Sequence, residues 1–181
     1  MGGREHHPSQ SRPMLRQAPT MRFFLLLSCL ASLCLAAAAT AEHKHVPLPQ
    51  FEALFSVNLQ VLTESTFQGP FGTRVHSMTS GGNLTNATTG EIVGQVLQNQ
   101  DNGLYSTSGI FFPSVVLPVV WAADQKLGSI FITGVGVGET VKAYLHLETE
   151  SPKWSSLNSR FLIANLVYVP PAANITIFGE L

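Results

Sequence analysis

The chain has 181 residues, of which 45% are hydrophobic and 12% charged, and its formal net charge at pH 7 is −1. Residues 42–181 hold six basic and ten acidic side chains and carry a net charge of −4, because the beginning of the chain is basic. A segment without clustered Lys and Arg lacks the phosphate contacts on which nucleic-acid binding depends, so this composition argues against nucleic acid as a partner.

The amino-terminal part has the pattern of a secretory signal peptide. Arg22 precedes a hydrophobic core at 23–35, and Ala39-Thr40-Ala41 then offers a cleavage site. The core is shorter than the roughly 20 residues that a membrane-spanning helix needs. We therefore expect residues 1–41 to be a leader and cleaved signal peptide; a retained signal anchor is the alternative.

Cleavage would make the protein secreted, extracellular and free of the membrane. Both cysteines, Cys29 and Cys34, would leave with the leader, so the mature protein is expected to lack disulfides. Either Met1 or Met21 would serve as the start. Three sequons for N-glycosylation lie in the mature part, and a secretory chain makes them usable; they begin at Asn83, Asn86 and Asn174.

The mature part has the length of a single domain, expected at 51–181 after a flexible, extended arm at 42–50. Apolar and polar residues alternate within 51–62 and 140–150, which is typical of half-buried strands. Strands are expected, in chain order, at 51–62, 73–78, 91–97, 105–121 with breaks at Pro113 and Pro118, 127–135, 140–150, 161–169 and 175–178.

The connections between these strands carry turn signals. A polar loop is expected from Ser80 to Gly90, and a tight turn at 98–103 that closes on Asn102-Gly103. No segment shows sustained helical periodicity. Short strands at hairpin spacing within one domain predict an all-β fold, a single antiparallel barrel or sandwich, and a barrel would also remove exposed sheet edges.

The chain from Leu54 to Phe178 resembles the domain of unknown function 3237 family, a group of small bacterial and fungal proteins. The matching segments, in chain order, are Phe51–Leu62, Gly72-Thr73-Arg74, Gly81-Gly82, Gly90–Leu97, Asp101, Asp124 and Leu157-Asn158. The resemblance implies a calycin-like or lipocalin-like barrel, for which we expect eight to nine strands. It implies little chemistry, because a fold does not determine a function.

One departure from the family pattern concerns a tryptophan expected before Leu157-Asn158. Ser156 stands there, and the nearest tryptophan is Trp154. If the family tryptophan lines the barrel mouth, ligand contacts at this point differ. The resemblance therefore adds Asp124, Trp154 and Asn158 to the candidate ligand-binding residues.

Two sets of alternating polar residues are candidates for acid–base chemistry. Arg74, His76 and Met78 share one strand face; inside the barrel, Arg74 would hold an anion and His76 would move a proton. Tyr144 and His146 share another face, together with Glu148. The alternative for both sets is an outer, solvated face. Neither metal-ligand spacing nor a nucleophile triad is legible, so no metal and no cofactor is expected.

The favoured interpretation is a secreted, glycosylated barrel that binds a small apolar or aromatic molecule in its cavity. The residues expected to line that cavity are Met78, Phe111, Phe112, Trp121 and Phe131, besides the three that the family resemblance adds. The alternatives are a cofactor-free isomerase, cyclase or lyase that uses Arg74, His76, Tyr144 and His146, and a surface interaction protein without cavity function. Titratable groups that converge in the cavity would favour the enzyme. The oligomeric state is open.

Overall fold

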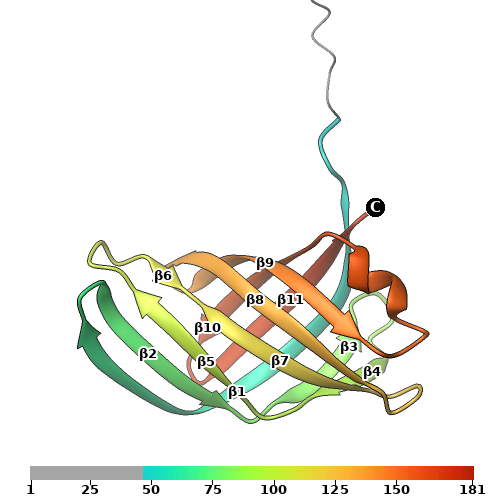
Figure 1. The fold of residues 1–181 in the computed structure, drawn as a ribbon, viewed down its shortest axis with the longest axis horizontal. Helices are drawn as coiled ribbons and strands as arrows, with labels where there is room; N and C mark the ends of the chain where they lie inside the picture. Colours follow the sequence, from blue (N-terminus) through green and yellow to red (C-terminus); the bar gives the residue numbers. More distant parts are fainter. Residues whose placement is uncertain (1–46) are drawn as a thin grey trace, which may run out of the picture. The chain divides into compact units, whose positions relative to one another are not determined.

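The computed structural model describes residues 47–181, so the expectations for the signal peptide and most of the arm lie outside the described residues. Residues 47–50 are exposed and have no regular structure. From Phe51 onward the chain forms eleven strands and one short helix (Figure 1). That 3-10 helix, η1 (Ser155–Ser159), is the only helix in this range and is far too short to cross a membrane.

The strands form one sheet in which all neighbouring strands are antiparallel. They are β1 (Phe51–Gly69), β2 (Gly72–Thr79), β3 (Gly82–Asn86), β4 (Ile92–Val96), β5 (Asn99–Tyr105), β6 (Phe111–Phe112), β7 (Ser114–Trp121), β8 (Leu127–Val137), β9 (Thr140–Thr149), β10 (Leu162–Val169) and β11 (Ala172–Glu180).

Pairing of the last strand with the first closes the sheet into a barrel. β11 pairs with β10 on one side and with β1 on the other, where the register runs from Phe51 opposite Glu180 to Gln60 opposite Ala172. Strand β7 closes the remaining side, because it pairs with β4, β5 and β8. The predicted all-β antiparallel barrel is confirmed, with eleven strands in place of eight to nine.

Two segments expected as connections are strands. The middle of the polar loop expected at 80–90 is occupied by β3, which pairs with β1 and β4. The expected turn at Asn102-Gly103 lies within β5, because all seven β5 residues, from Asn99 to Tyr105, pair with β2. The turn comes later instead, at 106–109, where Gly109 adopts a φ of 80° that favours glycine.

The core fills the barrel with aliphatic side chains from the inward faces of the strands. In β9, for example, Val141, Ala143, Leu145 and Leu147 are buried, whereas the residues between them are exposed. This pattern follows from the strand period of two, which sends alternate side chains to opposite faces. Glu148 and its outward-facing neighbours therefore lie on the solvated face.

Three aromatic side chains, here called the aromatic plug, close one end of the barrel. Trp121 at the end of β7 stacks on Trp154 just before η1, with ring centroids 5.1 Å apart. Phe55 of β1 packs edge-on against Trp154 at 5.2 Å and against Trp121 at 5.8 Å. In Figure 1 this end carries η1 and the β7–β8 turn, opposite the β1–β2 hairpin. The plug leaves the other end as the place for a cavity.

Candidate functional site

A cavity of about 90 Å³ lies inside the barrel, away from the aromatic plug. Its walls are mainly apolar, and polar side chains enter from the strands near the β1–β2 end. The lining residues are Leu59, Val61, Glu64, Val75, Ser77, Thr79, Asn99, Asp101, Tyr105, Phe111, Val115, Leu117, Gly138, Glu139, Val141, Leu166, Tyr168 and Ala173. An apolar pocket with a few converging polar groups is the usual form of a small-molecule site.

A β-bulge in β1 directs Glu64 into this cavity. Val61 pairs with Thr79, but the next pair joins Thr63 to Met78, so Leu62 is an extra residue on β1. Because the side-chain period is two, this extra residue changes which side chains point inward beyond it. Glu64 thereby lies opposite Ser77, on the face that lines the cavity.

Glu64, Ser77 and Asp101 form a row across three neighbouring strands. Ser77 of β2 pairs with Glu64 of β1 on one side and with Asp101 of β5 on the other. Neighbouring strands lie roughly 4.8 Å apart, so the two carboxyl-bearing residues flank one hydroxyl at strand spacing. The row places two acidic groups on one wall of the cavity.

The next row on the same wall contains two buried oxygens without partners. Thr79 and Asn99 face each other across β2 and β5, and their side chains are only 5% and 7% exposed. The Thr79 Oγ1 and the Asn99 Oδ1 have no hydrogen-bond partner, although the Asn99 Nδ2 donates to the carbonyl oxygen of Leu97 at 2.9 Å. Buried polar atoms are normally paired, so these two oxygens, like the Trp154 Nε1 in the aromatic plug, are exceptions within the described residues.

Asp101 has an environment that favours its neutral form. Burial raises the pKa of the Asp101 carboxyl above its ordinary value, while backbone N–H groups of Ser114 and Asn102 oppose the rise. The Ser114 N–H donates to the Asp101 Oδ1 at 3.1 Å. A carboxyl whose pKa is raised by burial is a typical acid–base or ligand-binding group.

Two tyrosines lie at the acidic side of the cavity. Burial raises the pKa of Tyr105, and the negative charges of Glu64 and Asp101 raise it further. The pKa of Tyr168 is raised by burial and then by Glu64 and Tyr105. Glu139 lines the cavity from the β8–β9 turn, and its carbonyl oxygen accepts the Tyr168 N–H at 2.8 Å. Besides burial, the charged and phenolic groups of the cavity thus raise the pKa values of the two tyrosines.

Glycine at position 103 makes room for the aromatic wall of the cavity. A Cβ at Gly103 would lie 2.3 Å from the ring of Phe111, so this ring lies directly over the β5 backbone. Phe111 also packs against Tyr105, with ring centroids 4.7 Å apart. Among the ligand-binding residues proposed from the sequence, Phe111 is the one that lines the cavity.

The predicted cavity placement of Arg74, His76 and Met78 is wrong. Their strand neighbours Val75, Ser77 and Thr79 point inward, which leaves the predicted set on the outer face. His76 stacks there on Phe67, and its Nδ1 lies 2.8 Å from the Asn102 Oδ1. The alternation was read correctly, but β2 presents its small and polar residues to the cavity.

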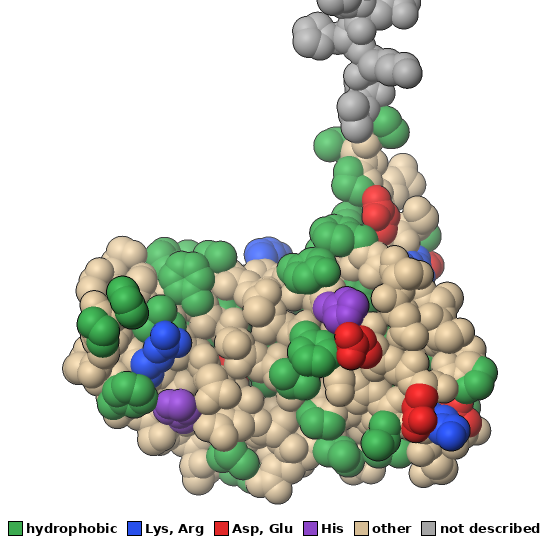
Figure 2. All heavy atoms as spheres, in the orientation of Figure 1, with side chains coloured by type: hydrophobic (Ala, Val, Ile, Leu, Met, Phe, Trp, Pro, Cys, Tyr) green, Lys and Arg blue, Asp and Glu red, His purple; other side chains and the backbone are tan. Residues whose placement is uncertain are grey.

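The outer face also holds the second predicted set. Tyr144 and His146 are exposed on β9, and the His146 Nε2 lies 3.1 Å from a carboxylate oxygen of Glu148. Phe131, opposite His146 on β8, and Phe112 are each 39% exposed and do not line the cavity. Figure 2 shows one face of the barrel, with few charged side chains scattered among hydrophobic and uncharged ones.

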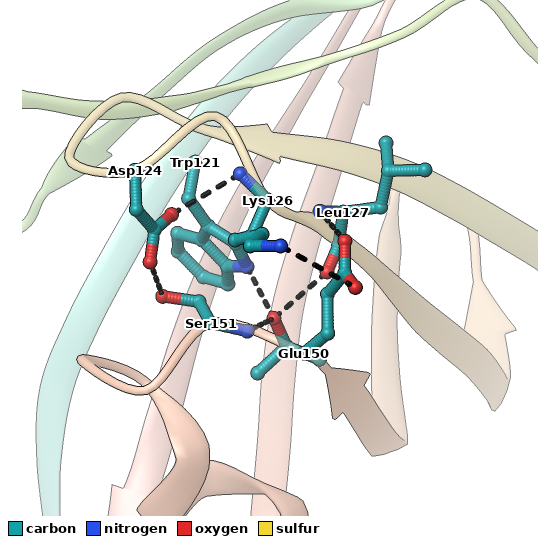
Figure 3. Close-up of polar contacts among 7 residues, drawn as sticks. Trp121, Asp124, Lys126, Leu127, Glu150 and Ser151 are labelled. Carbon is teal, nitrogen blue, oxygen red and sulfur yellow. Dashed lines mark hydrogen bonds and ion pairs between the residues drawn. The ribbon is translucent and has the colours of Figure 1, made fainter.

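The remaining predicted ligand-binding residues lie at the closed end. Trp121 is fully buried, and its Nε1 donates to the Thr149 Oγ1 at 2.7 Å. Asp124 accepts hydrogen bonds from the Ser151 hydroxyl at 2.6 Å and from a backbone N–H at 3.2 Å (Figure 3). These contacts hold the β7–β8 turn to the end of β9, so Trp121 and Asp124 stabilise the fold at this end of the barrel.

The family-like element around Asn158 belongs to the same end. Its Oδ1 accepts the Thr149 N–H at 2.9 Å, and its Nδ2 donates to the Thr149 carbonyl at 3.1 Å. Trp154 belongs to the aromatic plug and does not line the cavity. Asp124, Trp154 and Asn158 are therefore placed as parts of the barrel's closure, contrary to the expectation that they contact a ligand.

Two of the three sequon asparagines flank one outer position of β1. Asn83 of β3 and Asn174 of β11 are exposed, and both border a shallow surface hollow that also includes Asn58. The Asn58 Nδ2 donates to the Asn174 Oδ1 at 2.6 Å. Asn86 is half-buried, and its Oδ1 accepts the N–H groups of the two threonines that follow in the turn.

Sequence reasoning missed most of the polar groups of the cavity, namely Glu64, Ser77, Thr79, Asn99, Tyr105, Glu139 and Tyr168. It considered Asp101 as an acidic residue of the family pattern and as a possible partner of Arg74. The sequence does contain a signal for part of this set, because Val75, Ser77 and Thr79 alternate along β2 with the residues predicted to face the cavity. The position of Glu64 had no such signal, because a bulge is not visible in the pattern. Residues 47–181 contain no group of three or more His, Cys, Asp or Glu side chains placed to hold a metal.

Comparisons with known proteins support the fold. No model of a protein family matches the chain, and neither does any curated protein. A conserved protein of unknown function from Rhodopseudomonas palustris is similar in structure, with a TM-score of 0.66 and 13% identity; the match covers 75% of this chain and 100% of that one. A β-barrel-like protein from Acinetobacter baumannii gives a TM-score of 0.64 and 16% identity, covering 77% and 100%.

A fungal structure is also similar. It is described as an enzyme from Penicillium herquei, and it matches with a TM-score of 0.60 and 16% identity over 76% of this chain and 98% of that one. At these identities the likeness establishes the barrel fold alone. The resemblance to the domain of unknown function 3237 family stays a prediction.

Proposed function

We propose that the protein is a secreted β-barrel that binds a small, mainly apolar molecule in its cavity. The observation that carries this proposal is an apolar-walled cavity on which a few polar side chains, Ser77 and Asp101 among them, converge. A ligand with a polar group would contact the apolar wall and these polar side chains. Membership of the domain of unknown function 3237 family would be consistent with this role.

The size of the cavity limits the enclosed part of the ligand. Its volume of about 90 Å³ is smaller than the roughly 150 Å³ of an engineered cavity that holds benzene. A ligand larger than a few carbon atoms would therefore extend through the opening. This narrows the expectation of an aromatic ligand to one whose enclosed end is small.

Native mass spectrometry of the purified protein tests the proposal by detecting a retained small molecule. Ala173→Leu on β11 fills the cavity and should abolish retention, because Ala173 lines it. Ala172→Leu is the matched control, since Ala172 lies on the opposite face of the same strand and is not a lining residue. Equal retention by both variants would rule out binding in this cavity.

Secretion is supported by the signal-peptide pattern before Glu42 and by the exposure of two sequon asparagines, Asn83 and Asn174. Amino-terminal sequencing of protein from the culture medium should give a chain that starts at Glu42. Treatment with a glycosidase should lower its mass. A product that begins at Met21, or that stays with the membrane fraction, would contradict cleavage.

A second candidate function is a cofactor-free isomerase, cyclase or lyase. The observation that favours it is that Asp101, whose pKa is raised by burial, lines the cavity together with the phenol groups of Tyr105 and Tyr168. A carboxyl that exchanges a proton readily can shift a proton within a bound substrate. The similar fungal structure is described as an enzyme.

The test of this second candidate uses the molecule that native mass spectrometry retains. Incubated with the protein in D₂O, a substrate would exchange carbon-bound hydrogen or change its structure. Asp101→Asn should abolish this reaction, whereas Glu148→Gln, on the outer face of β9, should not. A molecule that is bound but stays unchanged would identify a carrier.

A further inference from the structure

The charges around the cavity are all of one sign. Glu64, Asp101 and Glu139 line it from β1, β5 and the β8–β9 turn, and no Lys, Arg or His of residues 47–181 is among the lining residues. An anionic ligand would meet these carboxyl groups without a counter-charge, and like charges at close range repel. The acidic lining therefore selects against carboxylates and favours a neutral or positively charged ligand.

The unpaired oxygens of the inner wall add a second, independent requirement. The Asn99 Oδ1 is an amide oxygen that can only accept hydrogen bonds, and the Thr79 Oγ1 beside it also has free acceptor capacity. A partner for the Asn99 Oδ1 would be a donor, whereas the Thr79 hydroxyl can donate or accept. Asp101 lies two residues from Asn99 on the same face of β5, so both side chains belong to this part of the wall.

Aromatic rings complete the surroundings. Tyr105, Phe111 and Tyr168 line the same cavity as the three carboxyl groups. A cation placed over such rings is attracted by their negative faces, more strongly where water is excluded. An ammonium group carries three donors, no acceptor and a positive charge, so it complements both the carboxyl groups and the aromatic rings of the lining.

We infer that the cavity binds a small primary amine as its ammonium ion, with the nitrogen beside Asp101 and Asn99 and the carbon chain against Val115, Leu117 and Val141. This inference rests on the proposed function as a ligand-binding barrel. The ammonium ion would also favour the ionised form of Asp101, since an opposite charge lowers the pKa that burial raises. The cavity volume of about 90 Å³ restricts the enclosed chain to a few carbons.

The experiment compares three probes of nearly equal shape, namely isopentylamine, isopentyl alcohol and isovalerate. Isothermal titration at neutral pH and low salt should show the amine binding roughly tenfold more tightly than the alcohol, because charge-assisted hydrogen bonds are about twice as strong as neutral ones. Isovalerate should bind most weakly. Added salt should weaken the binding of the amine and leave that of the alcohol nearly unchanged.

Variants of the carboxyl-bearing residues show which side chain causes the preference for the amine. Asp101→Asn should reduce the ratio of amine to alcohol affinity to about one, and Glu64→Gln should lower it in part, which keeps the test open if one variant misfolds. Glu148→Gln is the matched control, because this carboxylate is exposed on the outer face of β9. Alcohol binding as tight as amine binding in the unmodified protein would overturn the amine assignment and leave the ligand-binding function standing. Failure of all three probes to bind would overturn both.

Discussion

Thr79 of β2 and Asn99 of β5 face each other in the barrel wall, and each holds a buried oxygen without a hydrogen-bond partner. An unpaired buried polar atom costs about 1–3 kcal/mol of the free energy of unfolding. Each of these oxygens therefore lowers the stability of the protein unless it gains a hydrogen-bond partner. Sites built for binding commonly lower the stability of the free protein in this way.

Two threonine-to-valine substitutions should change stability in opposite directions. Thr79→Val removes an unpaired hydroxyl at nearly constant volume and should raise the free energy of unfolding by about 1 kcal/mol. Thr149→Val removes the acceptor of the buried Trp121 Nε1 and should lower it by about 1–3 kcal/mol. Urea denaturation measures both, and a loss of stability in Thr79→Val would show that its hydroxyl is paired in the free protein.

Asp101 should make stability depend on pH. Its pKa is raised in the folded protein by burial, so the folded state holds the proton more tightly than the unfolded chain. Its contribution to stability is therefore fully present below the ordinary value of 3.8 and is lost as pH rises through the folded pKa.

The melting temperature of Asp101→Asn, measured across this range, checks that sign. The variant should melt close to the unmodified protein at acid pH and above it at neutral pH, because the amide carries no charge to desolvate. Glu148→Gln, which changes an exposed carboxylate, should show no such trend. A variant that is less stable only at neutral pH would reverse the assignment.

The two arginines of the barrel domain should differ in importance. Arg74 is exposed and makes no ion pair within residues 47–181, so Arg74→Ala should change the free energy of unfolding by less than about 0.5 kcal/mol. Arg160 contacts a Glu52 carboxylate oxygen and the Glu180 carbonyl oxygen, each at 2.7 Å. Arg160→Ala should cost about 1 kcal/mol or more. Equal effects in chemical denaturation would contradict this difference.

Gly103→Ala should reduce ligand capacity. The new methyl group would meet the Phe111 ring at 2.3 Å and force it to move, and that ring is part of the cavity wall. Gly69→Ala is the control, because its nearest contact of 3.5 Å is ordinary. Titration with isopentyl alcohol should show weaker binding for Gly103→Ala alone. Unchanged affinity in both variants would mean that the ligand does not contact this wall.

Much of the barrel could be predicted because apolar and polar residues alternate along the chain with the period of two that a half-buried strand requires. In β9 the inward set from Val141 to Leu147 is apolar and the outward set is polar, so both the strand and its faces follow from the sequence. In β2 the same pattern gave the wrong face. The inward residues Ser77 and Thr79 are more polar than the outward Met78, because that wall faces a cavity and not the packed core.

The site was harder to predict because its residues come together through pairing and not through spacing. Glu64, Asp101 and Tyr168 lie far apart in the chain and meet only when β1, β5 and β10 are assembled. The role of the tryptophans was mispredicted for a different reason. Trp121 was expected to contact a ligand because it is aromatic and lies in an apolar run, but full burial against Phe55 and Trp154 makes it part of the structure.

The extra residue Leu62 affects how the length of β1 relates to the faces of its side chains. Before Leu62, the odd-numbered residues Leu59 and Val61 of β1 face the interior. After it, the even-numbered residues face that way, beginning with Glu64. Deleting that single residue would remove the bulge and place Thr63 directly after Val61, so the pairs from Thr63 opposite Met78 to Gly69 opposite Gly72 would keep their register and their faces. The bulge therefore separates the length of β1 from the face that Glu64 presents, so loss of this one residue would straighten the strand and keep the acidic wall of the cavity.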